Sequence, residues 1–414
     1  MDREQALLRR IWLNQLCMHD PGRIHACLQR FGSAENLYAA DTAAGLKGLG
    51  IRPDRLLDKS LAKAESLLET CEREHIQIVT IDDAAYPARL RHTAYPPQLL
   101  YVKGSLPAFD DLVCLCVVGT RKTSAQGKAF LRKLSAELAE CGILIVSGLA
   151  YGGDTAAHLG ALDAGGQTVG VLAGGVDLIY PSGNADLYRA ICECGAIVSE
   201  QPPGQAGSAA FYRDRNRIMA GLCNGVLVGE ANMRSGVIHT VNAAFDENRD
   251  VFAIPGPPYE QRAQYPDSLL QSGAKLVQKA EDILEEYVHV YVQELECGLH
   301  IREQIRKQYP HLRSLRKNWP AQAHAAADIR RKTPQPAQEA VPEKLYEQFD
   351  GTERTILKYL YEKGGTAQID DIATGCGIEM PVLSSTLLVL QMRGAVRQEA
   401  GNLFSLAPKK AVQR

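Results

Sequence analysis

Three glycine-rich turns, each directly after a short apolar run, dominate the middle of this 414-residue sequence. They lie at residues 117–121, 145–154 and 169–177, and a helical pattern follows the first two. Units of strand, glycine turn and helix that recur at this spacing predict an open, doubly wound α/β sheet. The turns of such a sheet meet at one edge, where backbone N–H groups at helix N-termini bind anions. We therefore expect the central region to hold a nucleotide's phosphate or the backbone of a nucleic acid.

Strand and helix patterns alternate from residue 112 to about residue 285. The expected strands are 113–118, 143–147, 168–172, 197–199, 225–228 and 250–253, and the expected helices are 128–141, 155–164, 185–193, 213–222 and 236–248. Two more strand-like runs, 76–81 and 99–102, precede them. Residues 76–285 are therefore predicted to form one extended Rossmann-like domain.

Residues 1–75 carry apolar residues at helical spacing and no strand pattern, which predicts a small helical domain of the SAM or helix-hairpin-helix kind. Within it, residues 46–51, with Gly48 and Gly50, resemble the hairpin of helix-hairpin-helix modules, whose backbone amides hold a DNA phosphate. A helical bundle with a plain glycine turn explains the same residues. Both interpretations stay open.

Residues 286–345 are predicted to link the central domain to a C-terminal domain. The segment begins acidic and then becomes basic, because Lys and Arg between Arg302 and Lys332 far outnumber Glu303 and Asp328. A solvated linker and a basic arm that binds nucleic acid both fit this composition.

Residues 346–414 show the order helix, helix, helix, hairpin, which predicts a winged-helix domain. Helical patterns occupy 352–361, 369–373 and 380–392, and a turn at Gly401 separates two strand-like runs. The exposed face of the third helix is not basic. It carries Ser384, Ser385, Gln391 and Arg393. Winged helices bind DNA or dock proteins, and this composition favours neither role.

The net charge of −2 means that any nucleic-acid binding must come from local patches. The eleven cysteines include Cys-x-Cys pairs at 114/116 and 192/194 but no Cys-x-x-Cys spacing. Strand or turn geometry explains both pairs, so we predict no metal site and no cofactor. Scattered cysteines, an acidic N-terminus and apolar runs too short to span a membrane favour a cytoplasmic protein.

The first glycine turn is the most basic of the three. It carries Arg121 and Lys122, with no acid before Lys133. Its glycines are too far apart for a P-loop, and Ala129 stands where a magnesium-binding hydroxyl is required. Since no Gly-x-Gly-x-x-Gly follows a strand either, neither ATP hydrolysis nor NAD binding is favoured. A small-residue turn with hydroxyls and cations suits a phosphodiester.

The second turn places Asp154 before a predicted helix and His158 one turn further on. An Asp/His pair is compatible with acid–base chemistry. The sequence offers no nucleophile motif and no second carboxylate to accompany it. We therefore interpret Asp154 as the cap of a helix that begins at Thr155, and His158 as a hydrogen-bonding residue that fixes the turn.

Residues 211–217 combine two aromatic rings with three arginines at a predicted helix start. Cations and ring faces together are what single-stranded nucleic acid binds. Arg215 and Arg217 cannot both point into the core, so at least one should face solvent, a partner, or an acid such as Glu200 or Glu230.

Residues 230–240 form a further turn at the end of a predicted strand. Ser235, Gly236 and Thr240 there suit an anion. A buried pair between Glu230 and an arginine is the structural alternative.

Taken together, these segments resemble the DprA/Smf family of bacterial DNA-processing proteins. The matching segments are residues 119–121, 147–152 with Asp154, 157–158 and 160–162, 168–177, 180–181 with Asn184, 199–200, 215–218 with 220–222, 230–231, 235–236 with Thr240, 251–256 and 272–274. They span the whole central domain in order. The sequence departs from the family pattern at Gly153, at residues 211–214 and at residues 237–238.

The resemblance implies a homodimer that binds incoming single-stranded DNA, protects it and helps load the RecA recombinase during natural transformation, without catalysis. It implies a positive pocket that contacts phosphates, with Arg121 as the first residue expected there and Lys122 as the next. The expected DNA contacts are Gly119, Thr120, Arg121, Lys122, Ser124, Lys128, Ser147, Gly148, Gly152, Asn184, Arg215, Arg217, Ser235 and Gly236.

Two other functions stay open. Nucleotide phosphoribohydrolases resembling the lysine decarboxylase-like group share this sheet type and also hold a phosphate, but they carry Pro-Gly-Gly-x-Gly-Thr where this chain has residues 230–236. The other is a DNA-associated scaffold whose winged helix docks a partner.

Overall fold

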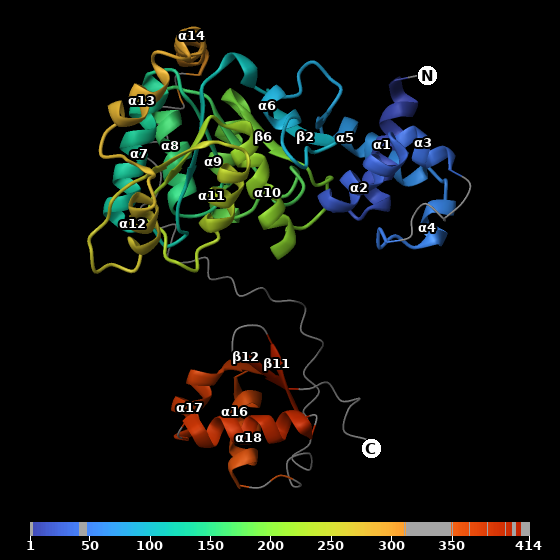
Figure 1. Ribbon diagram of the computed structural model, residues 1–414, viewed down its shortest axis with the longest axis vertical. Helices are drawn as coiled ribbons and strands as arrows, with labels where there is room; N and C mark the ends of the chain where they lie inside the picture. Colours follow the sequence, from blue (N-terminus) through green and yellow to red (C-terminus); the bar gives the residue numbers. More distant parts are fainter. Residues whose placement is uncertain are drawn as a thin grey trace. The chain divides into compact units, whose positions relative to one another are not determined.

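The computed structural model describes residues 3–40, 48–309, 311, 349, 351–363, 365–378, 380–393, 395–399 and 403–406. The chain divides into two compact units, residues 1–328 and 329–414. The first unit holds the N-terminal helices and a nine-stranded sheet, and the second holds a three-stranded sheet with its own helices (Figure 1). None of the described helices is long and apolar enough to cross a membrane.

The N-terminal segment is helical, as predicted. Its helices are α1 (Arg3–Leu16), α2 (Pro21–Phe31), α3 (Ala34–Ala39), α4 (Pro53–Leu57) and α5 (Ala62–Arg73). The side chain of Asp20 caps α2 by accepting from the Arg23 N–H at 2.9 Å. Leu8 and Ile11 of α1 share a core with Tyr101 of the sheet. Leu46 and Lys47 of the expected hairpin lie outside the described residues, and DNA contact there stays a prediction.

The doubly wound α/β sheet is confirmed. Its strands are β1 (Gln77–Thr80), β2 (Leu99–Gly104), β3 (Cys114–Val118), β4 (Leu144–Ser147), β5 (Thr168–Val171), β6 (Ala196–Ser199), β7 (Gly225–Val228), β8 (Asp250–Ala253) and β9 (Lys275–Leu276), in the order β1-β2-β6-β5-β4-β3-β7-β8-β9. Strands β3 to β9 pair in parallel, while β1 and β2 extend the sheet in antiparallel fashion. The strand order reverses between β3 and β7, which is the switch point where ligands of such sheets bind.

Helices cover both faces of the sheet (Figure 1). They are α6 (Ala88–Arg91), α7 (Ala125–Glu140), α8 (Gly153–Asp163), α9 (Ala185–Cys194), α10 (Ala209–Leu222), α11 (Val237–Asp246), α12 (Gln264–Gln271), α13 (Glu281–Tyr287) and α14 (Val292–Gln308). Cys114 and Cys116 of β3 face the core under α10 and α11, whereas Leu115 and Val117 face the core under α7 and α8. The Cys114/Cys116 spacing is therefore that of alternate residues on a strand.

Two central helices begin earlier than the apolar pattern predicts, because hydroxyl caps precede them. Ser124 caps α7 by accepting from the Gly127 N–H at 2.9 Å, and Ser208 caps α10 by accepting from the Phe211 N–H at 3.3 Å. The first turn of α7 is mostly polar, and that of α10 is exposed or partly exposed, so a buried apolar stripe does not mark either start.

The linker predicted at 286–345 begins with a long helix, of which the sequence indicates only a partly helical pattern up to residue 299. Helix α14 packs on the central domain, where Gly298 lies against the backbone of Gly142 and Arg302 Nη1 donates to the Glu140 carbonyl oxygen at 2.6 Å. Residues 292–308 are therefore part of the first unit rather than a solvated linker. The basic residues from 312 to 332 lie outside the described residues.

The C-terminal unit has the predicted winged-helix order. Its elements are α16 (Gly351–Glu362), β10 (Thr366–Gln368), α17 (Ile369–Cys376), α18 (Met380–Met392), β11 (Val396–Glu399) and β12 (Leu403–Leu406). Only the short strand β10 was not predicted; it pairs with β12 in a sheet of order β10-β12-β11. On the face expected to be exposed, Ser385 is exposed, and Arg393 Nη1 donates to Glu353 at 2.9 Å. The side chain of Ser384 is not among those that the structure describes.

Candidate nucleic-acid interface

A cavity of about 830 Å³ lies at the switch point, where β3 and β4 end beside α10 and α11. Seven of the fourteen expected contact residues line it: Gly119, Thr120, Arg121, Lys122, Arg215, Ser235 and Gly236. Its lining includes four cationic side chains, those of Arg121, Lys122, Arg213 and Arg215, and a single carboxylate, that of Asp154. The cavity is therefore suited to an anion.

The turn that carries Arg121 and Lys122 is held by hydrogen bonds at both ends. The Thr120 N–H donates to the Glu230 carbonyl oxygen at 2.7 Å, and the Thr123 hydroxyl donates to the Thr120 carbonyl oxygen at 2.6 Å. Arg121 and Lys122 themselves are exposed. The fixed turn thus presents two cations and the hydroxyl of Thr120 to the cavity.

Glu230 anchors this turn through Ser124 rather than through a buried arginine. Its carboxylate accepts from the Ser124 N–H at 2.7 Å and from the Ser124 hydroxyl. The nearest guanidinium nitrogen, Arg262 Nε, lies 3.9 Å away, and the Arg262 side chain is 42% exposed. The expected alternative of a buried Glu230–arginine pair is therefore wrong. Ser124 and Lys128 stand at the start of α7, outside the residues that line the cavity.

Glycines let the β3 turn touch the start of α8. A Cβ atom at Gly153 would lie 2.8 Å from Gly119 Cα. Gly152 has a φ of 84°, and a Cβ there would overlap the Thr120 carbonyl oxygen. Gly152 is therefore a packing position beneath the cationic turn.

Arg215 is buried and forms the floor of the cavity. Its Nη1 donates to the carbonyl oxygens of Gly148 at 2.8 Å and Val171 at 2.5 Å. A Cβ at Gly148 would overlap this nitrogen, so the glycine makes room for the guanidinium. Burial lowers the pKa of Arg215, and the Asp154 carboxylate opposes that shift.

An aromatic ring joins the two arginines of the cavity. The guanidinium carbons of Arg121 and Arg215 lie 5.4 and 5.8 Å from the centroid of the Tyr212 ring. These are cation–π distances. The ring therefore helps to hold the exposed Arg121 over the buried Arg215.

Asp154 and His158 are architectural, as interpreted, but in different roles from those expected. Helix α8 begins at Gly153, its N-cap is Gly152, and no side chain caps it, so the predicted Asp154 cap is wrong. The Asp154 carboxylate accepts from the Ala150 N–H at 3.3 Å instead. Burial raises its pKa, while Arg215 lowers it. His158 bonds to Thr168 rather than to Asp154.

The remaining expected residues hold the fold around the cavity. Arg217 Nη2 donates to both carboxylate oxygens of Glu200 at 2.7 Å, which is the acidic partner considered for it. The Ser147 hydroxyl donates to the Val117 carbonyl oxygen at 2.6 Å. Asn184 Nδ2 donates to the Leu149 carbonyl oxygen at 2.9 Å. None of Arg217, Ser147 and Asn184 is among the described residues that line the cavity.

The list of expected contacts omitted Tyr212, Arg213 and Asn216, which line the cavity from α10. These residues recur with Ala209 and Met219 at spacings of three and four, the spacing of one helix face. That pattern, combined with the position of the helix next to a glycine turn, was the signal available in the sequence.

We expect His158 to make the protein less stable as the pH falls below about 6.5. The Thr168 hydroxyl donates to the Ile145 carbonyl oxygen at 2.7 Å, so His158 Nδ1 carries a proton and donates to Thr168. Its Nε2 is buried with no partner in the described part of the chain, and burial lowers the pKa of His158 to about 3. Between these two pKa values, His158 therefore binds a proton in the unfolded chain but not in the folded chain. The free energy of unfolding should fall by up to about 1.4 kcal/mol per pH unit between these values.

Urea titrations of wild type and His158→Gln from pH 8 down to about pH 4 measure this contribution, because glutamine does not titrate there. Wild type should lose stability more steeply than the variant below pH 6.5, where the unfolded histidine titrates. Parallel curves would show that the histidine protonates equally well in both states.

Comparisons with known proteins agree with the fold. The family model described as DNA recombination-mediator protein A matches residues 77–288, and the DprA winged helix domain model matches residues 332–402. The DNA processing protein DprA of Streptococcus pneumoniae is 42% identical over 208 residues, which are 50% of this chain and 73% of that protein. The DprA of Bacillus subtilis is 35% identical over 230 residues, 56% of this chain and 77% of that protein.

A solved structure supports the same assignment. The X-ray structure of DNA processing protein A from Streptococcus pneumoniae aligns with a TM-score of 0.59 and 34% identity, covering 67% of this chain and 97% of that one. The matched family model spans the sheet, the switch point and the cavity described above. The chain therefore belongs to the DprA/Smf family of DNA-processing proteins.

Proposed function

We propose that this chain binds single-stranded DNA in the cavity at the switch point. The observation that carries the proposal is the concentration of exposed cations on a rigid turn. Arg121 and Lys122 project from the β3 turn, and Arg213 is exposed on α10 beside them. Phosphate contacts by Lys and Arg supply most of the affinity of proteins that bind nucleic acid without sequence preference.

A single strand fits this cavity better than a duplex. Tyr212 and the guanidinium of Arg121 together provide flat faces next to the cations. Bases stack on such faces, at about 1–3 kcal/mol per base, only where they are not already stacked within a duplex. The ring and the cations thus favour single-stranded DNA.

We propose a division of roles among the expected residues. Direct contacts to phosphates come from the backbone and side chains of Gly119, Thr120, Arg121, Lys122, Ser235 and Gly236. Supporting roles fall to Ser124, Ser147, Gly148, Gly152, Asn184, Arg215 and Arg217. Lys128, half-buried one turn into α7, adds to the positive field rather than contacting DNA.

We further infer that the chain acts as a recombination mediator, which forms a homodimer, helps load the RecA recombinase and works in the cytoplasm during natural transformation. The description of the matched family, a recombination mediator, supports this role. Phe245 of α11 and Leu276 of β9, 54% and 45% exposed, offer apolar surface for association. Buried free thiols such as Cys116 and Cys223 agree with a reducing compartment.

We propose binding without catalysis. Among the described residues that line the cavity, the single carboxylate is that of Asp154, which is buried and bonded to the Ala150 N–H. Among the same lining residues the exposed His239 is the other possible base, and no second carboxylate accompanies it to complete an acid–base pair. Release of free base from a nucleoside monophosphate by the purified protein would contradict this proposal.

Replacing Arg121 by alanine should weaken binding of single-stranded DNA about tenfold, because one charge-assisted contact to phosphate is lost. Fluorescence anisotropy of a labelled poly-dT oligonucleotide at low salt measures the effect. Arg189→Ala is the matched control, since Arg189 lies on α9, is 66% exposed and does not line the cavity. Equal affinities for the two variants would place the DNA site elsewhere on the chain.

A further inference from the structure

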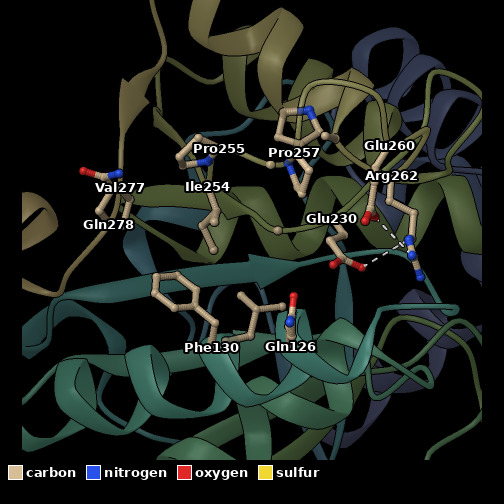
Figure 2. A pocket seen from close by; sticks show the side chains of 16 residues that line it. Gln126, Phe130, Glu230, Ile254, Pro255, Pro257, Glu260, Arg262, Val277 and Gln278 are labelled. Carbon is tan, nitrogen blue, oxygen red and sulfur yellow. Dashed lines mark hydrogen bonds and ion pairs between the residues drawn. The ribbon is translucent and has the colours of Figure 1, made fainter.

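A second cavity, of about 380 Å³, lies beside the first turns of α7 (Figure 2). Its walls come from α7, from the ends of β7, β8 and β9, and from residues 254–263. It shares no lining residue with the cavity at the switch point. Its size is within the range of pockets that hold small molecules.

The body of this second cavity is an apolar slot. Figure 2 shows Phe130 of α7 on one side, opposite Ile254 and Pro255, which follow β8. The apolar lining also includes Leu131, Pro257, Ala263, Pro266 and Val277. Two opposed apolar walls of this kind accommodate a flat ring, whose faces contact both walls.

One end of the slot is charged. Glu230, Glu260 and Arg262 lie together there (Figure 2), with Arg262 Nη2 3.1 Å from Glu260 and Arg262 Nε 3.9 Å from Glu230. Two carboxylates face one guanidinium, and the other donors to Glu230, the N–H and hydroxyl of Ser124, are neutral, so an excess negative charge remains. The other labelled polar side chains, Gln126 and Gln278, are neutral. The charged end therefore attracts a cation and repels an anion.

We propose that this cavity is a binding site for a small planar aromatic cation. The ring lies between Phe130 and Ile254, and an amidinium or ammonium group points to Glu230 and Glu260. This ligand class is opposite in charge to the phosphates proposed for the switch-point cavity. The second site goes beyond the proposed function and does not depend on it.

Saturation-transfer difference NMR with the full chain tests the site, with benzamidine as the cationic probe and benzoate as its anionic counterpart. Benzamidine should receive saturation from the protein, and benzoate should receive much less. Gln126→Trp should block the slot, since Gln126 is exposed on the first turn of α7 at its edge. Gln293→Trp is the control, because Gln293 is exposed on the first turn of α14 and does not line the cavity.

A charge variant tests the orientation of the probe. Glu260→Gln should weaken benzamidine binding about fivefold at low salt, the effect of losing one partly exposed ion pair. The proposal is overturned if Gln126→Trp and Gln293→Trp bind benzamidine alike, if benzoate binds as well as benzamidine, or if wild type shows no transfer at millimolar probe. Because no DNA is present, failure here leaves the DNA-binding proposal standing.

Discussion

Arg215→Met is expected to lower the free energy of unfolding by about 4 kcal/mol. The substitution leaves the buried carbonyl oxygens of Gly148 and Val171 without the guanidinium donor that they share. It also removes the positive charge that most lowers the pKa of the buried Asp154 carboxyl. Unpaired buried polar groups and charges carry the full cost of their lost hydration. Urea titration followed by circular dichroism measures the change.

The matched control is Arg213→Met on the same helix. Arg213 is exposed, so its loss should change the unfolding free energy by no more than about 0.5 kcal/mol. If Arg215→Met is as mild as Arg213→Met, the buried guanidinium does not hold the cavity floor together.

Gly152→Ala is expected to cost about 4 kcal/mol as well, for a different reason. The residue has a φ of 84°, where an L side chain is strained, and the new Cβ overlaps the Thr120 carbonyl oxygen. The overlap can be relieved only by moving the turn that carries Arg121. Thermal unfolding and oligonucleotide anisotropy should therefore both report a loss.

Gly273→Ala separates the cost of backbone strain from the cost of the overlap between the new Cβ and a neighbouring atom. Gly273 has a φ of 98°, but a Cβ there would meet nothing within 4 Å. This variant should therefore cost only the backbone strain, about 1–2 kcal/mol, and leave DNA binding unchanged. Equal losses of stability and of DNA affinity in both variants would contradict the close contact between Gly152 and Thr120.

The sheet was predictable from the sequence because each central strand is buried on both faces. Such strands read as continuous apolar runs, and the glycine turns that follow them mark one edge. Helix α14 was predicted only in part, because just three of its 17 residues, Leu295, Gly298 and Ile305, are buried. Strand β10 escaped because its alternation of exposed and buried side chains extends over only three residues, too few to indicate a strand.

The contents of the cavity were predictable in part. Arg215 and Arg217 are two positions apart, about 200° around a helix, so the sequence indicated that they point in different directions. It gave no means to decide that Arg215 is buried under the cavity while Arg217 binds Glu200. Ser147 and Asn184 were expected to contact DNA, whereas their hydrogen bonds to Val117 and Leu149 depend on contacts that are distant in sequence.

The most direct test of the account is the salt dependence of poly-dT binding by wild type, Arg121→Ala and Arg121→Glu, followed by fluorescence anisotropy. If phosphates lie against the β3 turn, Arg121→Glu should bind far more weakly than Arg121→Ala at low salt, because it adds repulsion to the lost contact. The two variants should converge as salt screens that repulsion. Equal binding by the two variants at low salt would contradict the placement of DNA in this cavity.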